Sequence, residues 1–206
     1  MTAQNKISVY LVDDNDVFLK TLAYSLNERF NSEIEIKSFV TGEVCLREIQ
    51  INPLTAADIV ILDYHLNTEI AEALNGIDVL RKIKKINNKI IVIMLSAEDK
   101  LQIATDCISN GAYEYVLKSE TAFVRTQNIL KNSLEKEFNS KIMKITMKIM
   151  EQHPELYKYI EEMQETIPDD GFGDSEVTLK NLKTYYDSLN TMVNKYVVDH
   201  PIAVKN

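Results

Sequence analysis

The sequence predicts an α/β fold, in which a doubly wound sheet of five parallel strands in the order 2-1-3-4-5 is followed by an all-α extension. Short apolar runs of strand length alternate along the chain with amphipathic segments of helix length. Such alternation indicates parallel strands joined by right-handed crossovers. The apolar runs are also nearly continuous, as they are in strands that helices cover on both faces. Together these observations favour a doubly wound sheet.

The first two predicted strands differ in how their apolar residues are arranged. Residues 6–12 are an apolar run, whereas 32–39 alternates apolar and charged residues, as an exposed edge strand does. Thr41 is placed to open the helix that follows this edge strand. The predicted strands are 6–12, 32–39, 57–63, 89–96 and 113–118, and the predicted helices are 16–30, 41–50, 76–86, 98–112 and one from about Glu120.

The rest of the chain predicts a helical region. Apolar residues three, four or seven apart indicate that the helix beginning near Glu120 continues to about Gln152. A further helix is expected from Pro154, a linker at 168–176 and a last helix over 175–198. We therefore expect a first domain at 1–133 and a helical output or dimerisation region at 134–206, with one helix crossing the boundary.

Side chains of particular interest in this region are three methionines and two histidines. Met143, Met147 and Met150 recur at helical spacing, which is more typical of a core than of a partner surface. His153 and His200 each precede a proline and are expected to be exposed.

Composition excludes several classes of protein. The 206 residues are 45% hydrophobic and 26% charged, and no apolar run approaches the roughly 20 residues of a membrane span. The net charge is −8, so nucleic-acid binding is disfavoured. The basic stretch 81–89 fits the solvated face of an amphipathic helix. Cys45 and Cys107 fall in predicted helices and suggest small core residues in a reducing cytoplasm rather than a disulfide framework.

Polar side chains stand where four of the predicted strands end. Strand one runs into Asp13 and Asp14, strand three into Asp63, strand four into Ser96 and strand five into Lys118. Because the carboxyl ends of parallel strands meet at one edge of the sheet, these side chains are expected to converge. A single aspartate there could simply begin a turn, but the whole set is not explained in that way.

The converging groups suggest phosphoryl chemistry. Three carboxylates that repel one another either raise a pKa or hold a hard cation, and Mg²⁺ suits a site with few protein ligands. A carboxylate can also act as a nucleophile and form an acyl phosphate. A metal, a lysine and a hydroxyl can together neutralise the charge of a phosphoryl group. The set therefore matches an aspartate that accepts a phosphoryl group.

These residues resemble the receiver domains of two-component response regulators, over roughly residues 6–132, and the resemblance implies a flavodoxin-like fold. It implies that Asp63 is the phosphoacceptor, that Asp14 binds Mg²⁺ directly and that Asp13 assists. The remaining protein ligand of the metal would be the main-chain carbonyl of His65.

The same resemblance assigns the other site residues. Ser96 matches the switch hydroxyl, Lys118 the lysine that pairs with a phosphate oxygen, and Tyr115 the aromatic switch residue. His65 and Glu98 stand where side chains flank the path of attacking water, so we expect them to set the lifetime of the phosphoryl group.

Two places depart from the pattern of receiver domains. The loop after Asp63 lacks the usual proline and reaches Gly76 about five residues late, either as a partner contact or as a tolerated insertion. Ser119 replaces the proline that usually follows the lysine, which puts the cis isomer of that peptide bond in doubt.

Two classes of function are weighed. The favoured one is a cytoplasmic response regulator, not itself an enzyme, that is phosphorylated by a sensor histidine kinase or phosphotransfer protein and acts through a homodimer or a downstream protein partner. The alternative is a Mg²⁺-dependent phosphohydrolase with Asp63 as nucleophile, although His65 stands where its general acid would be. A DNA-binding regulator with an unrecognised output is a weaker third reading, which the acidic C-terminal half disfavours.

Overall fold

The computed structural model describes residues 6–30, 33–53, 56–66, 73–160 and 179–199. The chain divides into two compact units, residues 1–128 and 129–206. Within the described residues, no helix is both long enough and apolar enough to cross a membrane.

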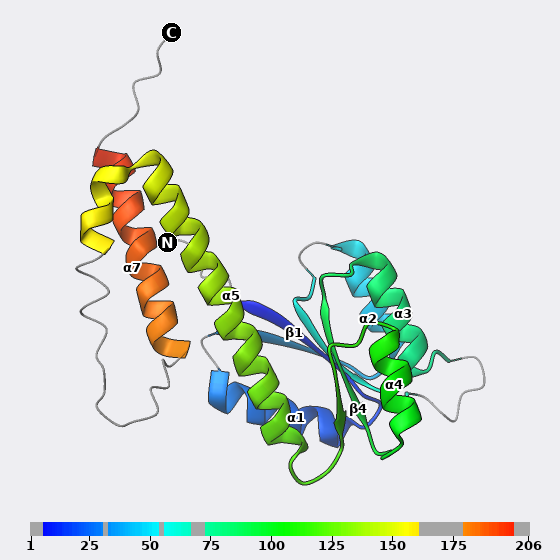
Figure 1. The fold of residues 1–206 in the computed structure, drawn as a ribbon. Coiled ribbons are helices and arrows are strands. Elements are labelled where there is room, and N and C mark those ends of the chain that lie inside the picture. Colours follow the sequence, from blue (N-terminus) through cyan, green and yellow to red (C-terminus); the bar gives the residue numbers. More distant parts are fainter. Residues whose placement is uncertain (1–5, 31–32, 54–55, 67–72, 161–178, 200–206) are drawn as a thin grey trace. The chain divides into compact units, whose positions relative to one another are not determined.

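The first unit is built on a five-stranded sheet (Figure 1). Every pairing is parallel and the strand order is β2-β1-β3-β4-β5, which confirms the predicted topology. The strands are β1 (Ile7–Val12), β2 (Ile34–Phe39), β3 (Ile59–Asp63), β4 (Ile91–Ser96) and β5 (Glu114–Leu117).

Helices cover both faces of this sheet (Figure 1). The helices of this unit are α1 (Asp16–Phe30), α2 (Gly42–Ile51), α3 (Gly76–Ile86), α4 (Leu101–Ser109) and the first residues of α5 (Ala122–Gln152). Thr41 caps α2 as predicted, with its hydroxyl accepting a hydrogen bond from the N–H of Val44. Helix α4 is shorter at both ends than the predicted 98–112. It stops where Gly111 takes a φ of 96°, a left-handed conformation that suits glycine after a helix.

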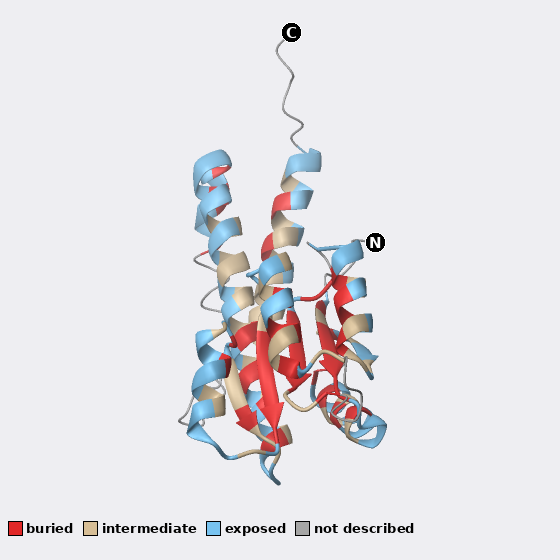
Figure 2. Cartoon of the chain, turned by 90° about the vertical axis from the view of Figure 1, so that its right-hand side faces the viewer, coloured by how far each residue is buried: buried red, intermediate tan, exposed pale blue. Residues whose placement is uncertain are grey.

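The core lies between the sheet and its helices, and the strands carry most of its buried surface (Figure 2). Alternate residues of each strand face opposite sides, so β3 contributes Val60 and Leu62 to one side and Ile59 and Ile61 to the other. Both cysteine thiols are free and buried, as expected. Apolar burial on both faces makes the sheet a rigid support for the residues that follow its strands.

The second unit is helical. Helix α5 runs unbroken across the predicted domain boundary to Gln152, as the periodicity indicated, and is followed by the short helix η1 (Pro154–Leu156) and by α7 (Leu179–Asp199). The predicted linker at 168–176 lies outside the described residues, as does His200. The core of this unit contains buried residues from α5, η1 and α7, namely Ile149, Leu156, Leu189 and Val193, together with Ile160, which follows η1.

Two expectations about this unit are wrong. His153 is only 9% exposed, because its ring packs edge-on against that of Tyr196 on α7 at a centroid distance of 5.3 Å. The three methionines of α5 are more than half exposed rather than in the core. Ile142, Ile145 and Ile149 take the packed face of the helix instead, and the methionines project from the opposite side.

Candidate functional site

The site begins with two neighbouring strands whose ends are level. Val12 of β1 pairs with Leu62 of β3, so the next residues, Asp13 and Asp63, reach the same edge of the sheet. Asp13 is held there because its N–H donates to the carbonyl of Phe39 at the end of β2. The central position of β1 and β3 in the sheet therefore brings the two carboxylates together.

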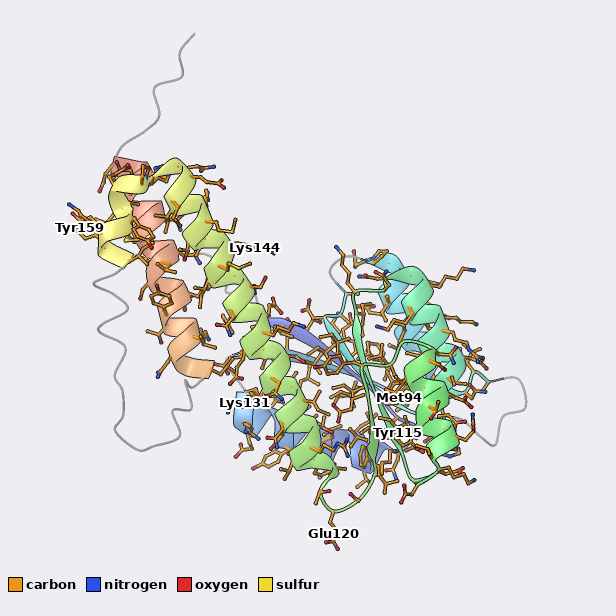
Figure 3. All side chains as sticks on the ribbon, in the orientation of Figure 1. Met94, Tyr115, Glu120, Lys131, Lys144 and Tyr159 are labelled. Carbon is orange, nitrogen blue, oxygen red and sulfur yellow. The ribbon has the colours of Figure 1, made fainter. Side chains whose placement is uncertain are left out.

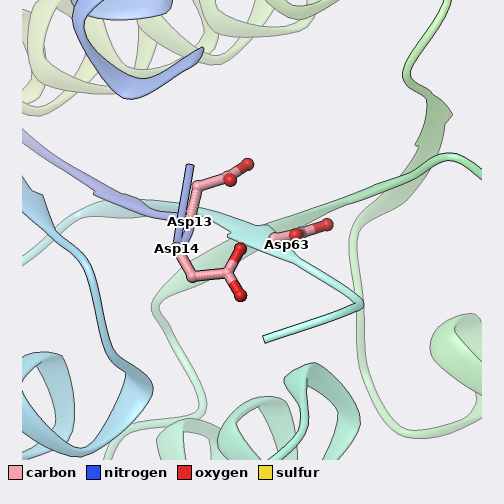
Figure 4. Close-up of side chains that lie close together, drawn as sticks. All are labelled: Asp13, Asp14 and Asp63. Carbon is pink, nitrogen blue, oxygen red and sulfur yellow. The ribbon is translucent and has the colours of Figure 1, made fainter. Parts of the chain in front are cut away.

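Three carboxylates gather at this edge (Figure 4). Carboxylate oxygens of Asp13, Asp14 and Asp63 lie within 4.8 Å of one another. Asp13 and Asp63 are only 2% and 4% exposed, whereas Asp14 faces solvent. Such a group suits a hard cation that is open to water and to a ligand on one side.

Lys118 is the cation of the site. Its Nζ donates to Oδ2 of Asp13 at 2.7 Å and lies 2.9 Å from Oδ1 of Asp63. The ammonium group also lies 4.6 Å from the centroid of the Phe18 ring on α1. The Lys118 N–H donates to the Ser96 carbonyl at 2.6 Å, so the pairing of β4 and β5 continues to this residue and fixes its position.

The electrostatics of Asp13 reflect this crowding. Burial raises the pKa of its carboxyl group above the ordinary value, and the nearby charge of Asp63 acts in the same direction. Hydrogen bonds from Lys118 and from the Asn15 N–H oppose this rise in the pKa. The pKa of Asp13 therefore stays above its ordinary value, because the hydrogen bond from Lys118 offsets the effect of burial only in part.

Ser96 and Tyr115 lie at the neighbouring strand ends. Ser96 is fully buried, and its Oγ accepts a hydrogen bond from the Glu98 N–H at 3.1 Å. The Tyr115 hydroxyl donates to the Glu98 carbonyl at 2.5 Å, and burial raises the pKa of this tyrosine (Figure 3 labels its position). The loop after β4 is therefore tied to both predicted switch residues.

His65 and Glu98 meet above the strand ends. Nε2 of His65 lies 3.0 Å from Oε1 of Glu98, and the other carboxylate oxygen of Glu98 pairs with Lys100. This contact with Lys100 lowers the pKa of Glu98. The two residues that were predicted to flank the path of water thus contact each other directly.

Gly76 explains how the chain returns after the acceptor strand. A Cβ at this position would lie 2.1 Å from the Asp63 carbonyl oxygen and 2.7 Å from Cα of Tyr64, both backbone atoms. The Gly76 N–H donates to the Tyr64 carbonyl at 3.0 Å. Glycine is required here because α3 begins directly against the backbone of the acceptor segment. Most of the lengthened loop before it, residues 67–72, lies outside the described residues.

Sequence reasoning missed three contributors to the site. Phe18 supports Lys118, Lys100 pairs with Glu98, and Glu43 of α2 accepts a hydrogen bond from the Leu74 N–H at 2.8 Å. Only Phe18 could have been predicted from the sequence, because it stands in the first turn of the helix that follows Asp13 and Asp14. No peptide bond in the described residues is cis, so the bond between Lys118 and Ser119 is trans.

The residues present fit a divalent cation. Oδ1 of Asp63 is buried and makes no hydrogen bond of good geometry besides its ion pair with Lys118, so it retains capacity to bind another positive group. Asp13 and Asp14 supply further carboxylate oxygens within reach. Oxygen donors of this kind are those that Mg²⁺ prefers.

An acidic cluster, a partly buried lysine and a buried hydroxyl at the carboxyl edge of this sheet are the features of a receiver domain. The model of the response regulator receiver domain family matches residues 9–124, more than half of the chain. The protein belongs to this family.

Curated relatives share this part of the chain. A protein-glutamate methylesterase/protein-glutamine glutaminase of Treponema denticola is 29% identical over 125 residues, which are 58% of this chain and 31% of that protein. Two-component response regulator ORR27 of Oryza sativa is 27% identical over 117 residues, 57% of this chain and 17% of that protein. The chain thus spans less than a third of the length of these relatives.

Solved structures agree on the fold. The CheX-CheY complex of Borrelia burgdorferi with BeF3 and magnesium is 27% identical, with a TM-score of 0.50, and the match covers 60% of this chain and 87% of that one. A CheY-like receiver domain protein of Methanospirillum hungatei, 19% identical with a TM-score of 0.51, shows the same fold over 62% of this chain and 93% of that one.

Proposed function

We propose that this protein is a response regulator that accepts a phosphoryl group on Asp63 and signals through protein interactions of its helical C-terminal region. The observation that carries the proposal is the placement of the buried Asp63 carboxylate beside Lys118 and close to two further carboxylates, Asp13 and Asp14. A nucleophile, a cation for a phosphate oxygen and a metal-binding acidic pair are thereby assembled at one point.

The chemistry follows from these positions. A carboxylate oxygen of Asp63 attacks phosphorus, the new P–O bond forms, and the bond to the donor breaks, with phosphohistidine of a kinase or phosphotransfer protein as donor. Lys118 Nζ, already 2.9 Å from Oδ1 of Asp63, neutralises charge on a phosphoryl oxygen. Asp13, Asp14, Asp63 and the main-chain carbonyl of His65 would hold Mg²⁺, which would supply further positive charge to the phosphoryl oxygens.

The phosphoryl group acts as a switch through the loop after β4. The Ser96 hydroxyl turns toward the new phosphoryl oxygens and gives up its contact with the Glu98 N–H. Glu98 also accepts a hydrogen bond from the Tyr115 hydroxyl through its carbonyl. When Glu98 shifts, the Tyr115 ring loses this hydrogen bond and moves. Helix α5 starts five residues after β5 and continues into the second unit without a break, so it is a direct route to the output.

The partners follow from this role. The chain receives its phosphoryl group from a sensor histidine kinase or a phosphotransfer protein, and it is the substrate of that transfer rather than an enzyme acting on another molecule. Two further interactions are proposed for residues 129–206, a homodimer and a downstream protein.

Sedimentation velocity tests the coupling of the two parts. The full-length protein is compared with and without beryllofluoride, in the presence of Mg²⁺, and Asp63→Asn serves as the control. We expect the mimic to change the sedimentation coefficient of the wild type alone. An identical change in Asp63→Asn, or no change in either protein, would contradict control of the helical region by Asp63.

A further inference from the structure

Helix α5 has two unlike faces in its second half. Ile142, Ile145 and Ile149 belong to the core of the second unit. On the opposite side, Met143, Met147 and Met150 are 58%, 51% and 54% exposed. At 3.6 residues per turn these methionines fall within an arc of about 60°, so they form one continuous apolar stripe. Flexible, polarisable side chains of this kind adapt readily to a partner's surface.

Lysines accompany the stripe. Lys136 lies in line with the methionines, and Lys144 and Lys148 follow about 60° and about 100° further round the helix on one side. Lys144 marks this stretch of α5 in Figure 3. All three are exposed, and none forms an ion pair with another residue that the structure describes. By contrast, Lys131 and Lys141 of the same helix pair with glutamates four residues away.

The methionine–lysine face, defined as Met143, Met147, Met150, Lys136, Lys144 and Lys148, is thus apolar in the middle and basic at its edge. Of the glutamates in this stretch of α5, Glu135 and Glu137 pair with Lys131 and Lys141, and Glu151 is exposed, so the three lysines of the face stand against one glutamate. The chain as a whole has a net charge of −8. A basic surface on an acidic protein points to an acidic partner.

We infer that the methionine–lysine face binds an acidic amphipathic helix of another protein, whose apolar residues contact the methionines and whose carboxylates pair with the lysines. This inference deepens the proposed output role and rests on it. A second copy of the same face fits less well, because it offers further lysines rather than carboxylates to the lysines of the first copy. The inference also explains why side chains this apolar stand on the surface of α5.

A defined peptide tests the inference. The probe is a fluorescein-labelled synthetic helix of about 18 residues with leucines along one face and glutamates beside them, and its matched control has lysine in place of each glutamate. Fluorescence anisotropy is measured with full-length protein, Mg²⁺ and beryllofluoride. We expect the acidic peptide to bind and the basic peptide not to bind, with affinity that falls as salt is added.

Variants of exposed residues locate the binding surface. The double variant Lys144→Glu/Lys148→Glu should bind the acidic peptide roughly tenfold more weakly and should gain affinity for the basic peptide. Met143→Gln/Met147→Gln should weaken binding of the acidic peptide to a similar degree. Lys195→Glu and Val198→Gln, which change exposed residues of α7, should leave its affinity unchanged.

Each contrary result is distinct. Equal affinity of the face variants and the α7 variants for the acidic peptide, or no binding at all, would overturn the inference. A dimer in sedimentation velocity that Met143→Gln/Met147→Gln dissociates would show that a second copy covers the face, and would overturn it as well. Binding that needs the methionines and lysines but ignores beryllofluoride would support the surface and count against control by Asp63 instead.

Discussion

Replacing Lys118 by methionine should destabilise the first unit through the carboxylates that it leaves behind. The side chain of this lysine is 18% exposed, and its Nζ contacts the carboxylates of Asp13 and Asp63, whose side chains are 3% and 5% exposed, at 2.7 and 2.9 Å. Breaking a buried ion pair costs about 3–5 kcal/mol. Because this lysine retains some contact with water and the Asp13 carboxyl group can take up a proton, we expect a loss of about 2–3 kcal/mol in the free energy of unfolding near neutral pH.

The loss in free energy of unfolding caused by Lys118→Met should depend on pH. In the wild type, the hydrogen bond from Lys118 lowers the pKa of Asp13 and opposes the effect of burial. Without that bond the pKa of Asp13 in the folded state rises further above its unfolded value, so the folded state binds a proton more readily. A raised carboxyl pKa contributes stability at low pH that is lost as the pH rises through the folded-state pKa. The destabilisation should therefore be largest near pH 7 and should shrink toward about pH 5.

The assay is urea denaturation followed by far-UV circular dichroism in EDTA, at about pH 7.5 and about pH 5. Lys20→Met is the matched control, because Lys20 makes a similarly short ion pair with Asp16, at 2.6 Å, but the two side chains are 76% and 61% exposed. Its loss should cost less than about 0.5 kcal/mol. A Lys118→Met variant as stable as Lys20→Met, or a cost that grows as the pH falls, would refute the reasoning.

Three further predictions follow from single contacts. Gly76→Ala places a Cβ 2.1 Å from the Asp63 carbonyl oxygen and should lower the free energy of unfolding by at least about 2 kcal/mol in the same assay. A cost below about 1 kcal/mol, the size expected of a surface substitution, would show that the backbone yields. His65→Ala and Glu98→Ala each remove one partner of the 3.0 Å contact above the strand ends. Each should shorten the half-life of the phosphorylated protein by up to roughly tenfold, measured by its decay on Phos-tag gels. Unchanged half-lives in both variants would contradict the role assigned to these residues. Burial raises the pKa of the Cys45 thiol to about 12. Cys45 should therefore resist a thiol reagent near pH 8 until urea unfolds the chain. Rapid labelling of Cys45 in the native protein would contradict its burial.

Much of the fold and the convergence at its edge could be predicted because they depend on local pattern and on parallel topology. The convergence of Asp13, Asp63 and Ser96 can be predicted without knowing any side-chain contact, because each follows or ends an apolar run and parallel strands bring these ends together. The ion pairs of Lys118 depend instead on β5 lying beside β4, and on the direction of one long side chain.

The second unit was harder to predict, because helical spacing does not say which face is buried. In α5 the isoleucines and the methionines both recur three or four residues apart, and only the packing against the rest of the unit selects the isoleucines. His153 was misjudged for the same reason. A following proline indicates a helix end, but the burial of the ring is decided by Tyr196, more than 40 residues further along the chain.

Phosphorylation of the purified protein by acetyl phosphate tests the central claim most directly, with intact mass spectrometry as the readout. With Mg²⁺ present we predict the addition of one phosphoryl group, released by hydroxylamine as an acyl phosphate is, and no addition in EDTA or in Asp63→Asn. No addition to the wild type with Mg²⁺, or addition that persists in Asp63→Asn, would contradict the assignment of Asp63 as the phosphoacceptor.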